Sequence, residues 1–193
     1  MKVNQSIALV FAFVLSVCAH AQDLGSPTTI DTDKDGLYDN LEVNTHKTDP
    51  NVADTDGDGL TDGEEIYDYN TNPLLKDSDG DGLSDGQEIN IHKTNPLVAD
   101  TDEDGLRDGV EVTLLNTNPL VQDSDGDGIH DGAEDSDSDG LSDANELNNY
   151  LTNPKVADSD QDGLSDGDEI NIHKTNPLVA DTDEDGLRDG VEV

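Results

Sequence analysis

Apolar residues occupy few positions in this chain, and most recur at an interval of 23 residues. Within one such unit, Leu83, Ile89 and Ile91 stand among acidic and small residues, and Leu97 and Val98 follow a proline. A fixed period of this length predicts a repeat array in which each unit packs against its neighbours. We expect these apolar side chains to form a seam between successive units.

The polar residues between the apolar ones predict a short helix in each unit. Full units carry a Thr-Asn-Pro or Thr-Asp-Pro turn, as at Thr94-Asn95-Pro96, and proline ends a preceding helix. Asp85 is a candidate N-cap, with Glu88 three residues later as its capping-box partner. Gly86 weakens the helix, so the pattern predicts two turns at most.

The stretch before this helix carries the candidate chemistry. It reads Asp77-Ser-Asp-Gly-Asp-Gly-Leu-Ser-Asp-Gly-Gln-Glu88, with acids at positions 1, 3, 5, 9 and 12 and glycine at position 6. This is the ligand pattern of a twelve-residue EF-hand calcium loop, in which position 7 offers its backbone carbonyl. Only three residues separate Pro73 from Asp77, so the incoming helix of a full EF-hand is missing.

The pattern occurs eight times, without a substitution among the five acids, and it accounts for 40 of the 47 acidic residues. We predict about one Ca²⁺ per loop. The predicted ligands are, in loop 1, Asp31, Asp33, Asp35, Leu37, Asp39 and Glu42; in loop 2, Asp54, Asp56, Asp58, Leu60, Asp62 and Glu65; in loop 3, Asp77, Asp79, Asp81, Leu83, Asp85 and Glu88; in loop 4, Asp100, Asp102, Asp104, Leu106, Asp108 and Glu111; in loop 5, Asp123, Asp125, Asp127, Ile129, Asp131 and Glu134; in loop 6, Asp135, Asp137, Asp139, Leu141, Asp143 and Glu146; in loop 7, Asp158, Asp160, Asp162, Leu164, Asp166 and Glu169; and in loop 8, Asp181, Asp183, Asp185, Leu187, Asp189 and Glu192.

The composition makes a bound cation a condition for folding. The chain of 193 residues has a formal net charge of −38, and 3% of its residues are aromatic. Without counterions such a chain behaves as a disordered acidic polymer. The charge argues against nucleic acid and anionic lipid as partners. Magnesium is the competing ion, but a loop with seven oxygens favours calcium.

The N-terminus is a targeting segment. A short apolar run followed by Ala19-His20-Ala21 predicts a signal peptide at residues 1–21, a linker at 22–30 and the array at 31–193. The alternative is a lipoprotein signal with Cys18 as the lipidated residue. Cys18 is the only cysteine, so no disulfide can staple the mature chain. We expect no transmembrane segment after cleavage and a secreted, extracellular or cell-surface location, with the periplasm or outer-membrane surface as the other possibilities.

Two features break the regular array. Loop 6 follows loop 5 with no linker, which predicts a kink or a changed neighbour contact there. The chain ends at Val193, one residue past loop 8, so we interpret the array as truncated at its C-terminus.

The other polar residues give weaker signals. His46, His92 and His173 lack a second nitrogen or sulfur ligand nearby, so we interpret them as solvated. The lysines that follow them, Lys47, Lys93 and Lys174, are predicted to pair with a neighbouring loop's carboxylates. The sequence has no nucleophile–base constellation, phosphate loop or haem motif, and we predict no enzyme activity.

These motifs resemble the bacterial thrombospondin type 3 repeat. The resemblance rests on Asp54-Thr-Asp-Gly-Asp-Gly-Leu-Thr-Asp-Gly-Glu-Glu65 followed by Thr71-Asn72-Pro73, and it extends over residues 31–193. It implies calcium ligation by Asp54, Asp56, Asp58, Asp62 and Glu65, and by position in the other loops. It also implies extracellular arrays that act as spacers or adhesion-associated stalks. The cysteines of the animal repeats are absent here.

We therefore predict a calcium-stabilised repeat array of irregular loops and short helices, with EF-hand-like loops lacking the incoming helix and little or no sheet. The function most consistent with it is a secreted or cell-surface calcium-binding spacer or adhesion-associated array, with a cell-surface or matrix protein as a partner. The alternatives are a calcium-dependent protein-interaction module, and the N-terminal fragment of a larger surface protein or enzyme.

Overall fold

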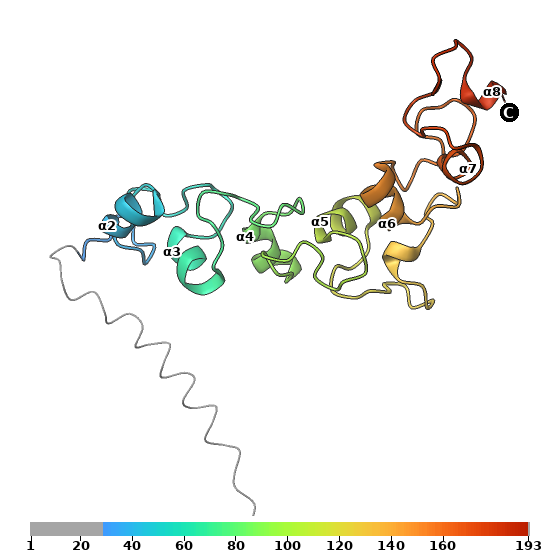
Figure 1. The fold of residues 1–193 in the computed structure, drawn as a ribbon. Coiled ribbons are helices and arrows are strands. Elements are labelled where there is room, and N and C mark those ends of the chain that lie inside the picture. Colours follow the sequence, from blue (N-terminus) through green and yellow to red (C-terminus); the bar gives the residue numbers. More distant parts are fainter. Residues whose placement is uncertain (1–28, 193) are drawn as a thin grey trace, which may run out of the picture.

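A computed structural model describes residues 29–192. The predicted signal peptide and most of the predicted linker lie outside these residues. Across the described part the chain is an extended succession of loops and short helices without strands, which confirms the predicted fold class (Figure 1). None of the helices in this part has the length and apolar character needed to cross a membrane.

Seven of the eight loops end in a short helix, and six of these helices continue as a wider π-type turn. The pairs are α2 (Asp39–Leu41) and η3 (Glu42–His46), α3 (Asp62–Glu64) and η4 (Glu65–Tyr69), α4 (Asp85–Gln87) and η5 (Glu88–His92), α5 (Asp108–Val110) and η6 (Glu111–Leu115), α6 (Asp143–Asn145) and η8 (Glu146–Tyr150), and α7 (Asp166–Asp168) and η9 (Glu169–His173); α8 spans Asp189–Glu192, and loop 5 ends in the single 3₁₀ turn η7 (Asp131–Ala133).

The helix begins one residue earlier than the sequence suggested. Its N-cap is Ser84, whose hydroxyl accepts a hydrogen bond from Gln87 N, while the Gln87 side chain accepts from Ser84 N. The predicted cap of Asp85 with Glu88 is therefore wrong. The physical reason is that both carboxylates are engaged elsewhere, as described below for the metal centre.

The predicted ion pairs of the lysines are also wrong. Lys93 adopts a left-handed conformation with φ of 67° at the helix end, and its Nζ donates to the carbonyls of Ile89 and Asn90 at 2.7 and 3.0 Å. Lys47 and Lys174 make the equivalent bonds. A lysine in this position satisfies the free carbonyls of the last turn and complements the helix dipole.

Successive repeats dock through a hydrogen bond that spans 28 residues. In loop 4, Gly109 N donates to Asp81 Oδ2 of loop 3 at 3.0 Å. The same bond joins Gly63 to Asp35, Gly86 to Asp58, Gly132 to Asp104, Gly167 to Asp139 and Gly190 to Asp162. Loops 2, 3, 4, 5, 7 and 8 are thus each fixed to the loop before them by the start of their own helix.

This contact explains the glycine at position 10, which helix propensity alone describes as a poor helix residue. A Cβ on Gly109 would lie 2.5 Å from the carbonyl oxygen of Asp81. The glycine is needed because the backbones approach so closely. The two loops without glycine at this position are loop 1, with Asn40, and loop 6, with Ala144, and these are the loops that do not dock in this way on a preceding one.

The apolar seam is narrower than predicted. The position-7 side chains Leu37, Leu60, Leu83, Leu106 and Leu141 are buried, as expected. In contrast, Ile91, Leu97 and Val98 are exposed. Contacts in a repeat array are few, so in these five loops the position-7 side chain is enclosed, while the residues around the proline turn remain on the outside.

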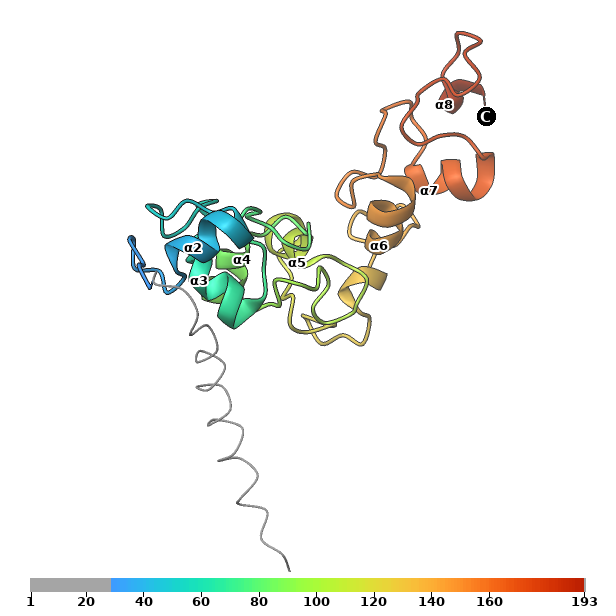
Figure 2. The same cartoon turned by 60° about the vertical axis from the view of Figure 1, so that its left-hand side comes forward.

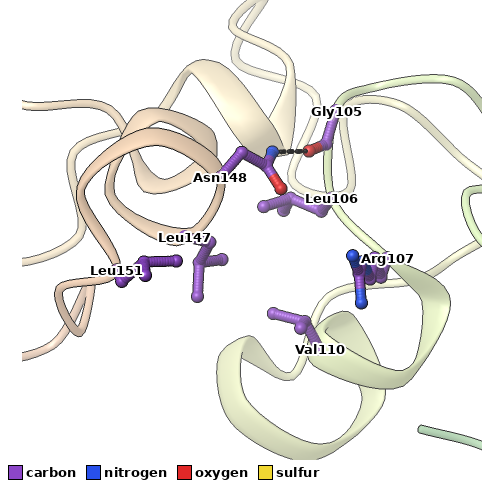
Figure 3. A pocket seen from close by; sticks show the side chains of 7 residues that line it. All are labelled: Gly105, Leu106, Arg107, Val110, Leu147, Asn148 and Leu151. Carbon is purple, nitrogen blue, oxygen red and sulfur yellow. Dashed lines mark hydrogen bonds between the residues drawn. The ribbon is translucent and has the colours of Figure 1, made fainter. Parts of the chain in front are cut away.

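The array changes direction between loops 5 and 6. Helices α2 to α5 follow one another, and α6 to α8 continue along a different line (Figures 1 and 2). At this elbow Asn148 Nδ2 of η8 donates to the carbonyl of Gly105 in loop 4 at 3.0 Å. Leu147 and Leu151 face Leu106 and Val110 across a cavity of about 290 Å³ (Figure 3). The predicted change of neighbour is confirmed, because loop 6 packs back on loop 4.

Candidate metal centre

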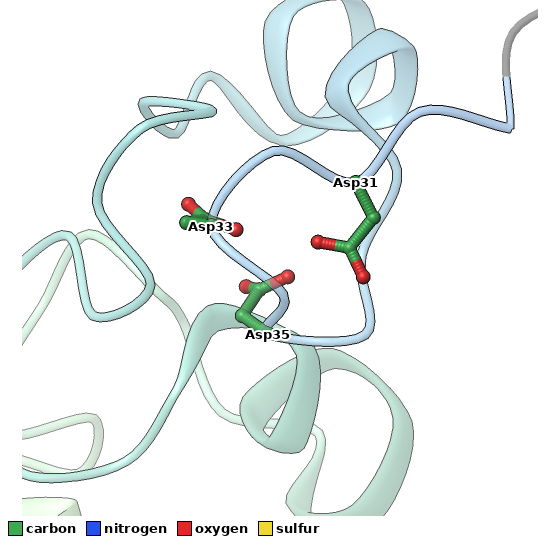
Figure 4. A group of neighbouring side chains, drawn as sticks. All are labelled: Asp31, Asp33 and Asp35. Atoms are coloured by element: carbon green, nitrogen blue, oxygen red, sulfur yellow. The ribbon is translucent and has the colours of Figure 1, made fainter.

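The first three aspartates of each loop converge on the inside of a tight turn. In loop 1, Asp31, Asp33 and Asp35 each bring a carboxylate oxygen within 4.8 Å of the others, and their side chains point into the ring formed by the loop backbone (Figure 4). The equivalent groups form in loop 2 from Asp54, Asp56 and Asp58 and in loop 3 from Asp77, Asp79 and Asp81. The predicted ligands at positions 1, 3 and 5 are therefore brought together in these loops.

Backbone N–H groups hold these aspartates in place, and the first and third of them accept two such bonds each in loop 3. In loop 3, Asp77 accepts from Gly80 N at 2.6 Å and from Gly82 N at 3.1 Å, where Gly82 has a left-handed φ of 109°. Asp81 Oδ1 accepts from Leu83 N at 2.6 Å, while its Oδ2 receives the neighbour's Gly109 N–H. Both carboxylates are thus oriented before any ion arrives.

The glutamate at position 12 is held by the threonine of the proline turn. Thr94 Oγ1 donates to Glu88 Oε1 at 3.2 Å, and the corresponding threonines hold Glu42, Glu65, Glu111, Glu146 and Glu169. The Thr-Asn-Pro motif by itself indicates only that a helix ends at this threonine. Its constant spacing of six residues from the glutamate was the signal that could have identified it.

The second oxygen of each of these glutamates has no protein partner. Glu88 is fully buried, and its Oε2 accepts no hydrogen bond from the described residues. The same holds for Oε2 of the five other glutamates, Glu42, Glu65, Glu111, Glu146 and Glu169. The position-3 aspartate also has buried oxygens without a hydrogen-bond partner: one oxygen in loops 2, 3, 4 and 7, and both oxygens in loops 1 and 6. Buried carboxylate oxygens are costly unless a donor or a metal satisfies them.

The aspartate at position 9 joins two repeats. Asp108 is fully buried, and its carboxylate accepts from Thr101 N at 2.8 Å and from Thr101 Oγ1 at 2.6 Å. It also lies with Asp81 and Glu88 of the preceding loop in a group whose oxygens are within 4.8 Å of one another, and Asp62 meets Asp35 and Glu42 in the same way.

This contact between repeats was not foreseen, because sequence spacing assigned each position-9 aspartate to its own loop alone. The hydroxyl at position 2 that holds it was also missed. Its residue is serine or threonine in all eight loops: Thr32, Thr55, Ser78, Thr101, Ser124, Ser136, Ser159 and Thr182. In each loop this hydroxyl donates to the position-9 aspartate.

The crowded carboxylates hold protons more tightly than usual. Burial and the charges of Asp79 and Asp81 raise the pKa of Glu88 to about 8. Burial and the charge of Asp81 raise the pKa of Asp79 to about 6. These raised pKa values reflect buried carboxylates that repel one another, and a divalent cation between them would offset that repulsion.

The donor set fits calcium. The candidate donors are carboxylate oxygens, several of them buried with no hydrogen-bond partner, and oxygen is the ligand atom that Ca²⁺ takes in six to eight contacts. No nitrogen or sulfur ligand belongs to these acidic groups, so the softer transition metals have no preferred partner there. The acidic clusters can therefore hold a metal ion.

Loops 5 and 8 differ from the other six. In loop 5, Asp125, Asp127 and Ile129 are exposed, and within residues 29–192 no glycine of the following repeat donates its N–H to Asp127. In loop 8, Asp183 and Leu187 are exposed in the same manner, and no repeat follows in this sequence. The predicted ligands of these two loops are present but are not enclosed by a neighbour.

The matched family decides the identity of the repeat. The family described as "Bacterial TSP3 repeat" matches eight times, at residues 31–53, 54–76, 77–99, 100–122, 123–134, 135–157, 158–180 and 181–193. This chain belongs to the bacterial TSP3 repeat family. The resemblance inferred from the loop and turn motifs is thereby confirmed, and the short match at 123–134 is the TSP3 unit without a linker.

Similar segments occur in two solved structures. "Biofilm associated protein - B domain" is 49% identical over 23% of this chain and 11% of that chain, with a TM-score of 0.23. "Biofilm associated protein - BSP domain" is 50% identical over 23% of this chain and 8% of that chain, with the same TM-score. The matched TSP3 segment thus spans about a tenth of those chains. No curated protein matches this one.

Proposed function

We propose that this protein is a calcium-binding repeat array of the cell surface or extracellular space, in which Ca²⁺ stiffens the chain into a spacer or adhesion-associated stalk. The observation that carries the proposal is the buried, unpartnered Glu Oε2 in six loops. In loops 1 and 3, Glu42 and Glu88 also lie in a group with an aspartate of the same loop and one of the next repeat. An ion at this place would supply the missing partner and neutralise the charge.

The predicted ligands have distinct parts in this proposal. In loop 3, Asp77, Asp79 and Asp81 would bind from one side and Glu88 from the other, while the Leu83 carbonyl completes the ring. Asp108 of the next repeat lies against the same group. An ion bound there would join a loop to the next repeat. Calcium binding and the contact between repeats would then stabilise each other, so the array would become stiffer as the sites fill.

The role we propose is structural rather than catalytic. Two facts support this role: buried carboxylates of neighbouring repeats gather in groups that could hold a metal ion, and the repeats form an extended array. A location outside the cytoplasm follows from the predicted signal peptide. The intact mass of the exported protein tests this: a chain starting at Gln22 supports it, whereas a lipid-modified Cys18 shows an anchored form.

Small-angle scattering and circular dichroism, recorded with calcium and with a chelator, test the calcium function. We expect a defined elongated particle with calcium and an expanded, less helical chain in chelator. A matched sample with Mg²⁺ in place of Ca²⁺ controls for general charge screening. An unchanged particle in chelator would overturn the proposal.

A further inference from the structure

We propose that loop 5 is a separate class of calcium site, open to water and weaker than the six enclosed sites, located at the elbow of the array. This inference rests on the proposed calcium function and refines it. It concerns the chain's one junction where two loops abut without a linker.

The first observation is that the neighbour's contribution is missing. In the docked repeats the next loop brings a glycine N–H to the position-5 carboxylate and a position-9 aspartate to the group. Loop 6 has Ala144 at position 10, where the docked repeats have glycine. The Cβ of Ala144 lies beside Gly132 and Gly105, about 3.3 to 3.4 Å from the point that a Cβ on either glycine would occupy, and not beside Asp127. The repeat after loop 5 therefore docks elsewhere.

The second observation is that the glutamate of loop 5 is not held in the usual way. Glu134 ends the short turn η7 in an extended conformation with ψ of 160°, because Asp135 already begins the next loop. The sixth residue after Glu134 is Gly140, which has no hydroxyl to donate to Oε1. The backbone carbonyl of Glu134 accepts a hydrogen bond from Asp143 N at 2.7 Å, which is the bond that the residue before a loop makes in the other repeats as well.

The third observation is exposure. Ile129 at position 7 is 48% exposed, whereas Leu83 at the same position of loop 3 is 3% exposed. Asp125 and Asp127 are exposed as well, and Glu134 is only half-buried. The six enclosed loops each bury their position-12 glutamate completely. A cation in loop 5 would keep water ligands that the enclosed sites replace with protein oxygens.

The expected size follows from the lost supporting contacts. Removing the hydrogen bonds that orient metal ligands lowers affinity by about 10- to 100-fold. Loop 5 lacks both the threonine and the glycine contact, so its affinity should lie at least about tenfold below that of loop 3. The five acids still provide the charge, so the site fills at higher calcium rather than failing to bind. The elbow would then be the last part of the array to become rigid.

Calorimetric titration of the full chain with Ca²⁺ tests this inference. All variants carry Glu192→Gln, which removes loop 8 from the comparison. We expect a tight phase and a distinct weak phase, with Glu134→Gln abolishing the weak phase alone. The matched variant Glu88→Gln, in an enclosed loop, should reduce the tight phase and leave the weak phase in place.

Terbium luminescence lifetimes in H₂O and D₂O supply a second readout, since they count the waters on the bound ion. The ion lost in Glu134→Gln should carry more waters than the ion lost in Glu88→Gln. Loss of a tight ion in Glu134→Gln, or equal water counts, would overturn the inference while leaving calcium binding intact. Absence of any calcium binding would instead refute the proposed function.

Discussion

The substitution Gly109→Ala tests whether docking between repeats completes the metal sites. The added Cβ would lie 2.5 Å from the carbonyl oxygen and 3.0 Å from the carbonyl carbon of Asp81, and both are backbone atoms. The repeat must move away, and the bond from Gly109 N to Asp81 Oδ2 is lost with it. The buried group formed by Asp81, Glu88 and Asp108 would then open.

Two opposing effects set the magnitude. Alanine favours a helix over glycine by about 1 kcal/mol. Against this, overpacking costs about 1–3 kcal/mol, and a hydrogen bond to a charged group contributes about 1.5–3 kcal/mol. The steric and hydrogen-bond terms outweigh the helix term, and we expect a net loss of about 3 kcal/mol in the calcium-loaded array. For the loop 3 site this corresponds to roughly 150-fold weaker calcium binding.

Chelator competition and thermal unfolding at fixed calcium measure both quantities. The matched control is Asn40→Ala, the same position in loop 1, which docks on no preceding repeat in this sequence. Asn40 is half-buried, but its Oδ1 accepts no hydrogen bond from the described residues, so the effect of this substitution should stay within about 0.5 kcal/mol. If Gly109→Ala is as mild as Asn40→Ala, or stabilises the array as helix propensity alone predicts, the docking argument is refuted.

Three further predictions address other contacts. Thr94→Val removes the hydroxyl that donates to Glu88 Oε1, so calcium binding by loop 3 should weaken about tenfold. Thr94→Ser keeps the hydroxyl and should keep the calcium affinity, and equal affinity of the two variants would contradict the role of the hydroxyl. The pKa of Glu88 is raised to about 8, so the metal-free fold is most stable at acidic pH and loses stability as pH rises from the glutamate's ordinary pKa of 4.5 toward 8. Calcium binding releases protons over the same pH range, so calcium affinity should increase with pH. Calorimetry in buffers of different ionisation enthalpy measures the proton release, and a pH-independent affinity would refute this prediction. Asn148→Ala breaks the bond to Gly105 at the elbow, so scattering should show a wider spread of particle dimensions with an unchanged number of bound ions; an identical profile would show that the elbow is held by other contacts.

Much of the repeat unit could be predicted because it is local. Acids at fixed spacing, with a glycine at position 6, determine a loop whose ends lie close together, and proline limits the following helix. The buried Leu83 and the meeting of Asp77, Asp79 and Asp81 followed from these signals.

The contacts between repeats could not be read from local rules. Propensity describes Gly109 as a poor helix residue, although the nearby carbonyl of Asp81 is what requires it. Asp85 is a good N-cap residue, yet Ser78 N and Oγ already donate to its carboxylate. Comparison across loops would have helped: Asn40 and Ala144 are the two exceptions at position 10, and they mark where a stack of repeats begins.

Locating the ions by anomalous diffraction from crystals of the calcium- or terbium-loaded chain tests the central claim most directly. The account predicts an ion about 2.3–2.6 Å from Glu88 Oε2, enclosed by the aspartates of loop 3 and lying against Asp108 of the next repeat. Ions found only on the outer surface of the loops, with Glu88 Oε2 still without a partner, would contradict it.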